Sequence, residues 1–214
     1  MIIELPQKFS YGNKARIEEG ILKIPTGIDT RKFMYCLTTA TKGKKCWYCG
    51  KILKKDEITM DHLYPHDLGG PTIANNLAPT CKECNNDKSN LTEKQYRMLR
   101  KYSGQQKDQI REKFLAENNV RKCKNGYFLP REWVRIRQTK KILVPWYMNE
   151  AYKGKKYAKI ETFYQHYGML PYPIVVDRNN YLLDGFLILM FAKNQNIPKV
   201  PTIIVENMEV VVNK

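Results

Sequence analysis

The chain has 214 residues, with 37 Lys or Arg against 21 Asp or Glu and a formal net charge of +16. A charge of this size favours a polyanionic partner, of which nucleic acid is the first candidate. No apolar run approaches the roughly 20 residues of a membrane span, and nothing resembles a secretory leader. We therefore expect a cytoplasmic protein of one large or two small domains, with no membrane partner.

The first predicted elements are a short extended segment over residues 1–10, a turn at Gly12 and Asn13, and a helix within residues 26–40. The apolar residues of that helix recur at near-helical spacing: Ile28, Phe33, Leu37 and Ala40. Thr26 or Asp29 is available as its N-cap. We expect this helix to pack on the segment that follows it.

That segment carries two C-x2-C pairs: Cys46 with Cys49, and Cys81 with Cys84. Four thiolates in this pattern close a tetrahedral Zn²⁺ site, which is structural because no coordination position stays open. The 31 residues between the pairs exceed the about 15–20 of a simple zinc ribbon, so the ion would clamp the base of an insertion. Two disulfides are the alternative, but a reducing compartment disfavours them.

The insertion reads as strand, loop, strand and helix. Residues 57–65 form the first strand, the paired glycines Gly69 and Gly70 make the bend, and residues 73–80 return. The helix is expected to begin near Asn85. Its N-terminus would favour an anion, so a metal ion and a phosphate would lie there.

Three residues of the insertion suit metal-assisted phosphodiester hydrolysis. His62, with an ordinary pKa of about 6.5, can take a proton from water at neutral pH. The side-chain oxygen of Asn76 can hold the other ring nitrogen and so fix the tautomer. Asp61 points to the opposite face of the strand, and a twisted strand end would bring both to one phosphate. The alternative for His62 is an ordinary half-buried histidine.

Two basic residues nearby are candidates for contacts with nucleic acid. Lys88 follows Asn85 by one helical turn and would face the same phosphate, unless it is simply a solvated helix charge. For His66 we expect a surface or phosphate-contacting position.

Residues 45–91 resemble the zinc-stabilised form of the HNH endonuclease family. The resemblance rests on "MDHLYP", the paired glycines, "NNLAPTC" and "CKECNNDKS", with Asn85 where many members have His. It implies a ββα-metal core in an HNN variant. It also implies Mg²⁺ or Mn²⁺ bound by Asp61 and Asn85, His62 as general base with Asn76 beside it, a DNA substrate and 5′-phosphate products.

Residues 92–145 are the most basic part of the chain, with 15 Lys or Arg against 5 Asp or Glu. Apolar residues at three- and four-residue steps predict two short helices separated by Gly104. Alternation over residues 132–138 predicts a strand or extended arm that carries Arg135 and Arg137, with Arg131 just before it. We expect these arginines to track phosphates, the alternative being a solvated charged face.

The C-terminal third predicts a helix stopped at Gly168, a strand over 174–176, a strand over 181–183, a helix from Gly185 and a strand over 202–205. This order, with "GMLPYPIVVD", "LLDG" and "IPKVPTIIVE", resembles the ParB/sulfiredoxin-like domain. The nucleotide-binding arginines of that family are missing after Gly185, where four apolar residues stand. We therefore expect a module for positioning, dimerisation or partner recognition, and no nucleotide binding.

Together these expectations describe an α+β protein: an HNH nuclease domain at 1–91, a basic helical connector at 92–140 and a ParB/sulfiredoxin-like domain at 141–214. The predicted activity is metal-dependent hydrolysis of double-stranded DNA, with a homodimer or protein partner bound through the C-terminal domain. The alternatives are a non-cleaving DNA-binding or regulatory protein that uses the zinc scaffold, and a nuclease for RNA or structured junctions.

Overall fold

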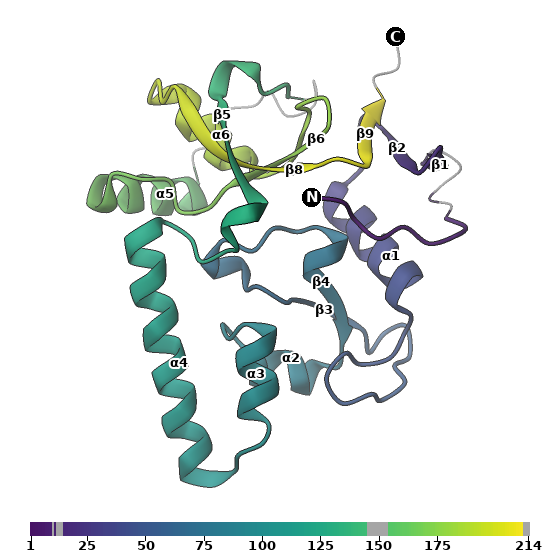
Figure 1. Ribbon diagram of the computed structural model, residues 1–214, viewed down its shortest axis with the longest axis vertical. Helices are drawn as coiled ribbons and strands as arrows, with labels where there is room; N and C mark the ends of the chain where they lie inside the picture. The colour runs from purple at the N-terminus through teal and green to yellow at the C-terminus, as the bar shows by residue number, and fades with distance from the viewer. Residues whose placement is uncertain (10, 12–14, 145–153, 212–214) are drawn as a thin grey trace.

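A computed structural model describes residues 1–9, 11, 15–144 and 154–211 of the protein, and it has the mixed α+β architecture expected from the sequence (Figure 1). The turn predicted at Gly12 and Asn13 lies outside the described residues. The helices are α1 (Thr30–Lys42), α2 (Lys82–Lys88), α3 (Glu93–Leu99), α4 (Gly104–Asn125), α5 (Lys155–Tyr167) and α6 (Phe186–Asn194). Across these described ranges, no helix has both the length and the apolar character needed to cross a bilayer.

The strands of the described residues form three sheets. The strands are β1 (Arg16–Glu18), β2 (Ile21–Pro25), β3 (Thr59–His62), β4 (Leu77–Thr80), β5 (Val134–Gln138), β6 (Ile174–Asp177), β7 (Leu182–Asp184), β8 (Lys199–Val205) and β9 (Met208–Val211). The sheet orders among the described residues are β1-β2-β9, β3-β4 and β5-β8-β6-β7. The strands predicted at the hairpin and in the C-terminal third are confirmed, whereas β1, β2 and β9 had not been predicted.

Two sheets join parts of the chain that are distant in sequence. β2 runs parallel to β9 with Leu22 opposite Met208, and β5 runs antiparallel to β8 with Arg135 opposite Thr202. Figure 1 shows the first strands lying beside β9 at the C-terminal end of the chain. Residues of the predicted first and second domains therefore supply strands to sheets of the third. The division at residues 91 and 140 stays a prediction.

The hydrophobic core has the same long-range character. One cluster of buried side chains joins Phe33 of α1 and Leu77 of β4 with Val175 and Ile203 of the C-terminal sheet. A second lies between α5, α6 and the four-stranded sheet, and a small third one surrounds the four-cysteine cluster. Phe33 is fully buried, which contributes about 1.5–3 kcal/mol. The hairpin β3–β4 is thus braced by α1.

α1 begins and ends at residues that the sequence offers for that purpose. The Asp29 side chain accepts a hydrogen bond of 3.1 Å from the backbone N–H of Lys32, and so it is the N-cap. Gly43 follows the last turn with φ +76°, a conformation that glycine adopts without strain. The Lys42 ammonium then donates to the backbone oxygens of Ala74 and Leu77. The helix end is therefore tied directly to the start of β4.

α2 and α4 differ most from the predicted bounds. α2 begins at Lys82 with Cys81 as N-cap, so Asn85 lies on its second turn and the helix N-terminus faces the cysteines. The expectation that the helix begins near Asn85, and places an anion there, is wrong because the helix already begins within the second C-x2-C pair, after Cys81. α4 has 22 residues, longer than predicted, because no glycine or proline interrupts it before Gly126.

Candidate functional site

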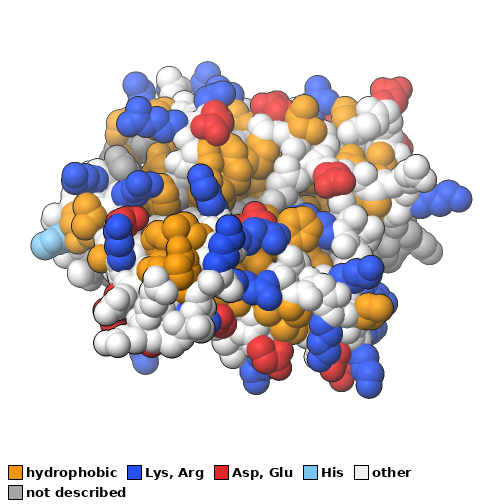
Figure 2. Space-filling model, turned by 60° about the horizontal axis from the view of Figure 1, so that its bottom comes forward, with side chains coloured by type: hydrophobic (Ala, Val, Ile, Leu, Met, Phe, Trp, Pro, Cys, Tyr) orange, Lys and Arg blue, Asp and Glu red, His pale blue; other side chains and the backbone are white. Residues whose placement is uncertain are grey.

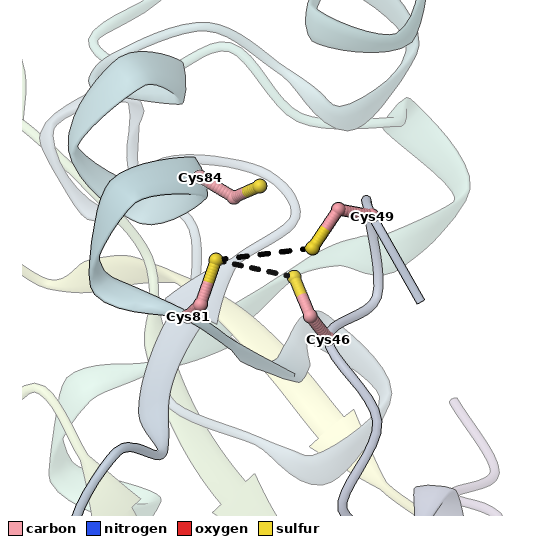
Figure 3. Close-up of side chains that lie close together, drawn as sticks. All are labelled: Cys46, Cys49, Cys81 and Cys84. Carbon is pink, nitrogen blue, oxygen red and sulfur yellow. Dashed lines mark hydrogen bonds between the residues drawn. The ribbon is translucent and has the colours of Figure 1, made fainter. Parts of the chain in front are cut away.

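The four cysteines of the two pairs converge beside the hairpin. Their ligand atoms all lie within 4.8 Å of one another, and Figure 3 shows the sulfurs turned toward a common centre. The Sγ atom of Cys81 is 3.7 Å from that of Cys46 and 3.9 Å from that of Cys49. Sulfurs bound at 2.3 Å around a tetrahedral Zn²⁺ would lie about 3.8 Å apart. The cluster is positioned to hold one metal ion, and its chemistry and spacing fit zinc.

Ionisation of these thiols favours a bound cation. Desolvation opposes the charged form of Cys46, but hydrogen bonds from the backbone at Cys49, Cys81 and Tyr48 outweigh it and lower the pKa to about 6. Burial, and then the neighbouring sulfurs, raise the pKa of Cys84. Cys46 therefore loses its proton readily, whereas Cys84 is harder to deprotonate. A bound divalent cation would stabilise the additional thiolates.

β3 and α2 bring the predicted catalytic residues together. Asp61 is 4% exposed and His62 is half-buried, at adjacent positions whose side chains leave the strand on opposite faces. From α2, the Asn85 amide nitrogen donates to Thr59 Oγ1 at 3.1 Å. This bond leaves the amide oxygen as the atom of Asn85 that can bind a cation.

Asp61 sits in a buried hydrogen-bonded group with two other side chains. Its Oδ1 accepts from the Lys88 ammonium at 2.9 Å, and its Oδ2 accepts from the Tyr48 hydroxyl at 2.6 Å. Lys88 also donates to the backbone oxygen of His62 at 2.8 Å. Burial raises the pKa of Asp61 and lowers that of Lys88, and the ion pair opposes both shifts. The geometry does not support a direct phosphate contact for Lys88, because its side chain is 0% exposed and its ammonium is engaged inside the protein.

His62 is held from one side of its ring. Its Nε2 lies 3.2 Å from the Thr72 hydroxyl. Burial first, and then the charges of His66, Lys88 and Arg31, lower the pKa of His62 to about 4. The imidazole is therefore neutral at pH 7, which is the form that can accept a proton. The exposed ring of His66 lies 5.7 Å from that of His62, between centroids, at the surface position expected for it.

Asn76 does not fix the His62 tautomer through its side chain as predicted. It is fully buried, and its amide bridges the loop after β3: Oδ1 accepts from Tyr64 N at 2.9 Å, while Nδ2 donates to Tyr64 O at 3.1 Å and Pro71 O at 2.9 Å. Gly70 leaves the space for this bridge, since a Cβ there would lie 1.8 Å from Tyr64 O. Asn76 therefore shapes the loop that leads to Thr72.

A cavity of about 180 Å³ collects most of the predicted site. Five predicted residues line it: Asp61, His62, His66, Asn85 and Lys88. Asn76 is adjacent but not part of the wall. Three predicted nucleic-acid contacts lie elsewhere: Arg131 precedes β5 and Arg135 and Arg137 are on it, all exposed and outside this cavity.

Sequence reasoning missed three residues of the site. Tyr48 was not predicted as a residue of this site, yet its hydroxyl donates a hydrogen bond to Asp61. Thr72 contacts His62 from a loop without periodicity, and Asp67 lines the cavity wall while accepting a 3.0 Å hydrogen bond from Asn90. No local pattern marks Thr72 or Asp67. Only the presence of a polar residue near the glycines could have drawn attention to them.

A hairpin and helix that hold a histidine, a carboxylate and an amide around one small cavity define a ββα site, and the four-cysteine cluster beside it is positioned to hold a metal ion. Residues 46–99 match the family model described as HNH endonuclease, which confirms the resemblance predicted for this segment. A solved Pnob8-like ParB-N domain is similar to part of the chain, with 17% identity and a TM-score of 0.29. That similarity covers 33% of this chain and 28% of the other, so the chain spans little more than a quarter of that structure. Comparison with curated proteins found no match.

Removing the partner of Asp61 should destabilise the site strongly. We expect Lys88→Met to lower the free energy of unfolding by about 3–5 kcal/mol, because it leaves a buried carboxylate without its counter-charge. Urea titration followed by tryptophan fluorescence measures this. Lys82→Met, an exposed change on the same helix, should cost less than about 0.5 kcal/mol. Equal losses in the two variants would contradict a structural ion pair, and adding Asp61→Asn to Lys88→Met should restore part of the stability.

Proposed function

We propose that the protein is a metal-dependent endonuclease that hydrolyses phosphodiester bonds in double-stranded DNA. One observation carries the proposal: Asp61, His62 and Asn85 meet at one 180 Å³ cavity inside the segment that matches the HNH endonuclease family. A base, a carboxylate and an amide oxygen around a small polar cavity are the groups needed for metal-assisted attack of water on phosphate.

Asp61 and Asn85 would hold the catalytic Mg²⁺ or Mn²⁺. Each oxygen of Asp61 already accepts one hydrogen bond, but a carboxylate oxygen has a second lone pair for a metal. Two protein ligands suffice because Mg²⁺ retains waters and takes phosphate oxygens as further ligands. When bound, the ion would supply positive charge to the phosphate and to the departing 3′ oxygen.

His62 is the general base in this proposal. Its Nε2 keeps a proton toward the Thr72 hydroxyl, and its Nδ1 carries the lone pair that takes a proton from the attacking water. The water oxygen forms a new bond to phosphorus while the bond from phosphorus to the 3′ oxygen breaks. The 3′ oxygen leaves with a proton from solvent, and the products are a 5′-phosphate and a 3′-hydroxyl.

The remaining residues position these groups. The four cysteines would hold a structural Zn²⁺, since four protein sulfurs leave no place for a reactive water. Lys88 and Tyr48 fix both oxygens of Asp61, and Asn76 shapes the loop that carries Thr72 to the His62 ring. These are positioning residues, because none of them would touch the reacting atoms.

The basic middle of the chain would supply affinity for DNA. Lys and Arg side chains are spread around hydrophobic patches over the face shown in Figure 2. Arg135 and Arg137 are exposed on β5, an edge strand of the four-stranded sheet, with Arg131 just before it. We propose that these arginines contact phosphates along the duplex, which strengthens binding without selecting a sequence.

Replacing two of these arginines should weaken the dependence of binding on salt. For Arg135→Gln with Arg137→Gln, we expect the slope of log K against log salt concentration to fall by about 2, because each phosphate contact contributes about 0.9. Fluorescence anisotropy on one duplex over a salt series measures the slope. Arg16→Gln with Arg178→Gln makes the same charge change at exposed positions distant in sequence from β5. Equal slopes for the two double variants would show that the arginines of β5 do not contact DNA.

One observation favours a protein that binds DNA without cutting it. The Lys88 ammonium lies 2.9 Å from Asp61 and already supplies positive charge to the carboxylate proposed as a metal ligand. Nicking of supercoiled plasmid in Mg²⁺ or Mn²⁺ separates the two functions. The endonuclease converts the plasmid to open-circular or linear forms only with the added metal, whereas the binding protein retards the plasmid and leaves it intact.

A further inference from the structure

We propose that a second, larger cleft beside His62 accepts an unpaired nucleotide of the DNA strand, next to the phosphate that is cleaved. Lysines of α5, in the C-terminal part of the chain, would contact the backbone of that nucleotide. This inference rests on the proposed endonuclease function and adds the substrate class: DNA with an unpaired nucleotide at the cleavage point.

The cleft adjoins the catalytic cavity. It has a volume of about 670 Å³, and His62, His66 and Asp67 line both it and the smaller cavity. One wall is α1 with the loop from Gly69 to Thr72. The other wall is α5, the residues from Pro171 to Pro173 and the turn at Asp184 and Gly185. The C-terminal module therefore completes a space into which the proposed general base opens.

The charge of the cleft suits a phosphate backbone. Four cationic side chains line it: Arg31, Lys122, Lys156 and Lys159. Three come from α1 and α5 and are exposed, while Lys122 of α4 is half-buried. The two carboxylates that line it already accept hydrogen bonds. Asp184 binds the backbone N–H groups of Thr72 at 3.2 Å and Gly185 at 2.8 Å, and Asp67 binds Asn90. Cations thus outnumber anions where a strand would enter.

Aromatic rings provide surfaces for a base. Tyr35, Phe163 and Tyr172 line the cleft from three different segments. The Lys122 ammonium lies 5.9 Å from the centroid of the Phe163 ring, and the His66 ring lies 5.7 Å from that of Tyr172. Alternating cations and rings of this kind are how proteins hold single strands, with phosphates on the cations and bases stacked on the rings.

The size of the cleft selects an unpaired nucleotide. A volume of 670 Å³ is within the about 300–1,000 Å³ of pockets that enclose one small organic ligand, and a nucleotide is of that size. A base inside a duplex must leave its stack and its partner before it can enter such a pocket. An unpaired base enters the cleft without the free-energy cost of breaking a base pair. A flap, bulge or bubble should therefore bind better than the paired duplex of the same sequence.

Binding to two oligonucleotides tests this without relying on cleavage. One is a duplex, and the other has the same sequence with a single unpaired 2-aminopurine. With no divalent metal added, we expect the wild-type protein to bind the unpaired substrate about tenfold more tightly and to quench the 2-aminopurine by stacking. Phe163→Leu should reduce the quenching.

The lysines of α5 are tested with a matched pair in the same part of the chain. Lys156→Ala with Lys159→Ala should weaken binding of the unpaired substrate by about tenfold or more and lower its salt slope by about 1.4, because single strands contribute about 0.7 per phosphate contact. Lys193→Ala with Lys199→Ala, exposed and outside the cleft, should change affinity less than about twofold. Zinc content should stay the same in both.

Equal affinity of the wild-type protein for the paired and unpaired substrates, or equal losses in the two lysine pairs, overturns the inference. The two proposals fail in different ways. A protein that prefers the unpaired substrate but never cuts in Mg²⁺ or Mn²⁺ supports the cleft and ends the endonuclease proposal. A protein that cuts paired DNA and binds both substrates equally supports the endonuclease proposal and contradicts the proposal that the cleft binds an unpaired nucleotide.

Discussion

His62→Ala should abolish metal-dependent nicking of plasmid DNA, with the rate falling by about 10²–10⁴. The alanine removes the neutral imidazole that takes the proton of the attacking water, and losses of a positioned general base are of this size. The initial rate of conversion of supercoiled plasmid in Mg²⁺ or Mn²⁺ measures the effect. Duplex affinity by anisotropy should change by less than about twofold, because the proposed phosphate-contacting side chains remain.

The chain contains two other histidines that serve as controls. His166, exposed on α5, lies outside both cavities, so His166→Ala should cut at the wild-type rate. His66 also lines the cavity, and the centroid of its ring lies 5.7 Å from that of the His62 ring. We expect His66→Ala to retain most of the activity. Full activity of His62→Ala would end the assignment of the base. If only His66→Ala is inactive, the base is His66.

Loss of the four-cysteine metal should unfold the segment around it. We expect one equivalent of zinc per chain, and Cys81→Ser or a chelator should remove it together with the cooperative thermal transition of this segment. The core here is small, and two of its seven buried residues, Cys46 and Cys81, are ligands themselves. Structural zinc in small domains is worth about 10–16 kcal/mol, which exceeds what such a core can replace. Calorimetry with elemental analysis of the protein measures both.

Two cysteines outside the cluster give the matched control. Cys36 and Cys123 are exposed on α1 and α4, so Cys36→Ser or Cys123→Ser should keep one zinc and the wild-type melting temperature. The second hydrophobic cluster, between α5, α6 and the four-stranded sheet, shares no residue with the small hydrophobic cluster around the four cysteines and should keep its own transition after chelation. A metal-free Cys81→Ser protein that melts like the wild type would show that the cysteines do not hold the fold together.

Features that depend on neighbours in sequence were predictable. The C-x2-C spacing places two sulfurs on one short turn, so the cluster of Cys46, Cys49, Cys81 and Cys84 followed from the pattern and is confirmed. Adjacent residues of a strand leave on opposite faces, so the split between Asp61 and His62 followed as well. Asp29, Gly43 and Gly168 mark helix ends because capping depends on the residues within one turn.

The partner of each polar side chain was decided by tertiary structure. Lys88 was expected to face a phosphate, but it turns inward because Asp61 is buried within 2.9 Å of its ammonium. Asn76 was expected to hold His62, but its amide satisfies Tyr64 and Pro71 instead, while Thr72 lies against the ring. A buried polar group must be hydrogen-bonded, and which group it finds depends on packing, which local sequence does not encode.

The sequence by itself determined the four-cysteine cluster, the strand, loop, strand and helix order of the segment around His62, and the candidate residues for metal-assisted hydrolysis, because each depends on residues a few positions apart. Tertiary structure alone decided that β2 joins β9, that β5 joins β8, and that α5 faces His62 across a cleft. The contacts of β2 with β9 and of α5 with the cleft join segments about a hundred residues apart or more. Those of β5 with β8 join segments about sixty residues apart. Burial of a shared hydrophobic core selects them, and no short pattern records that choice.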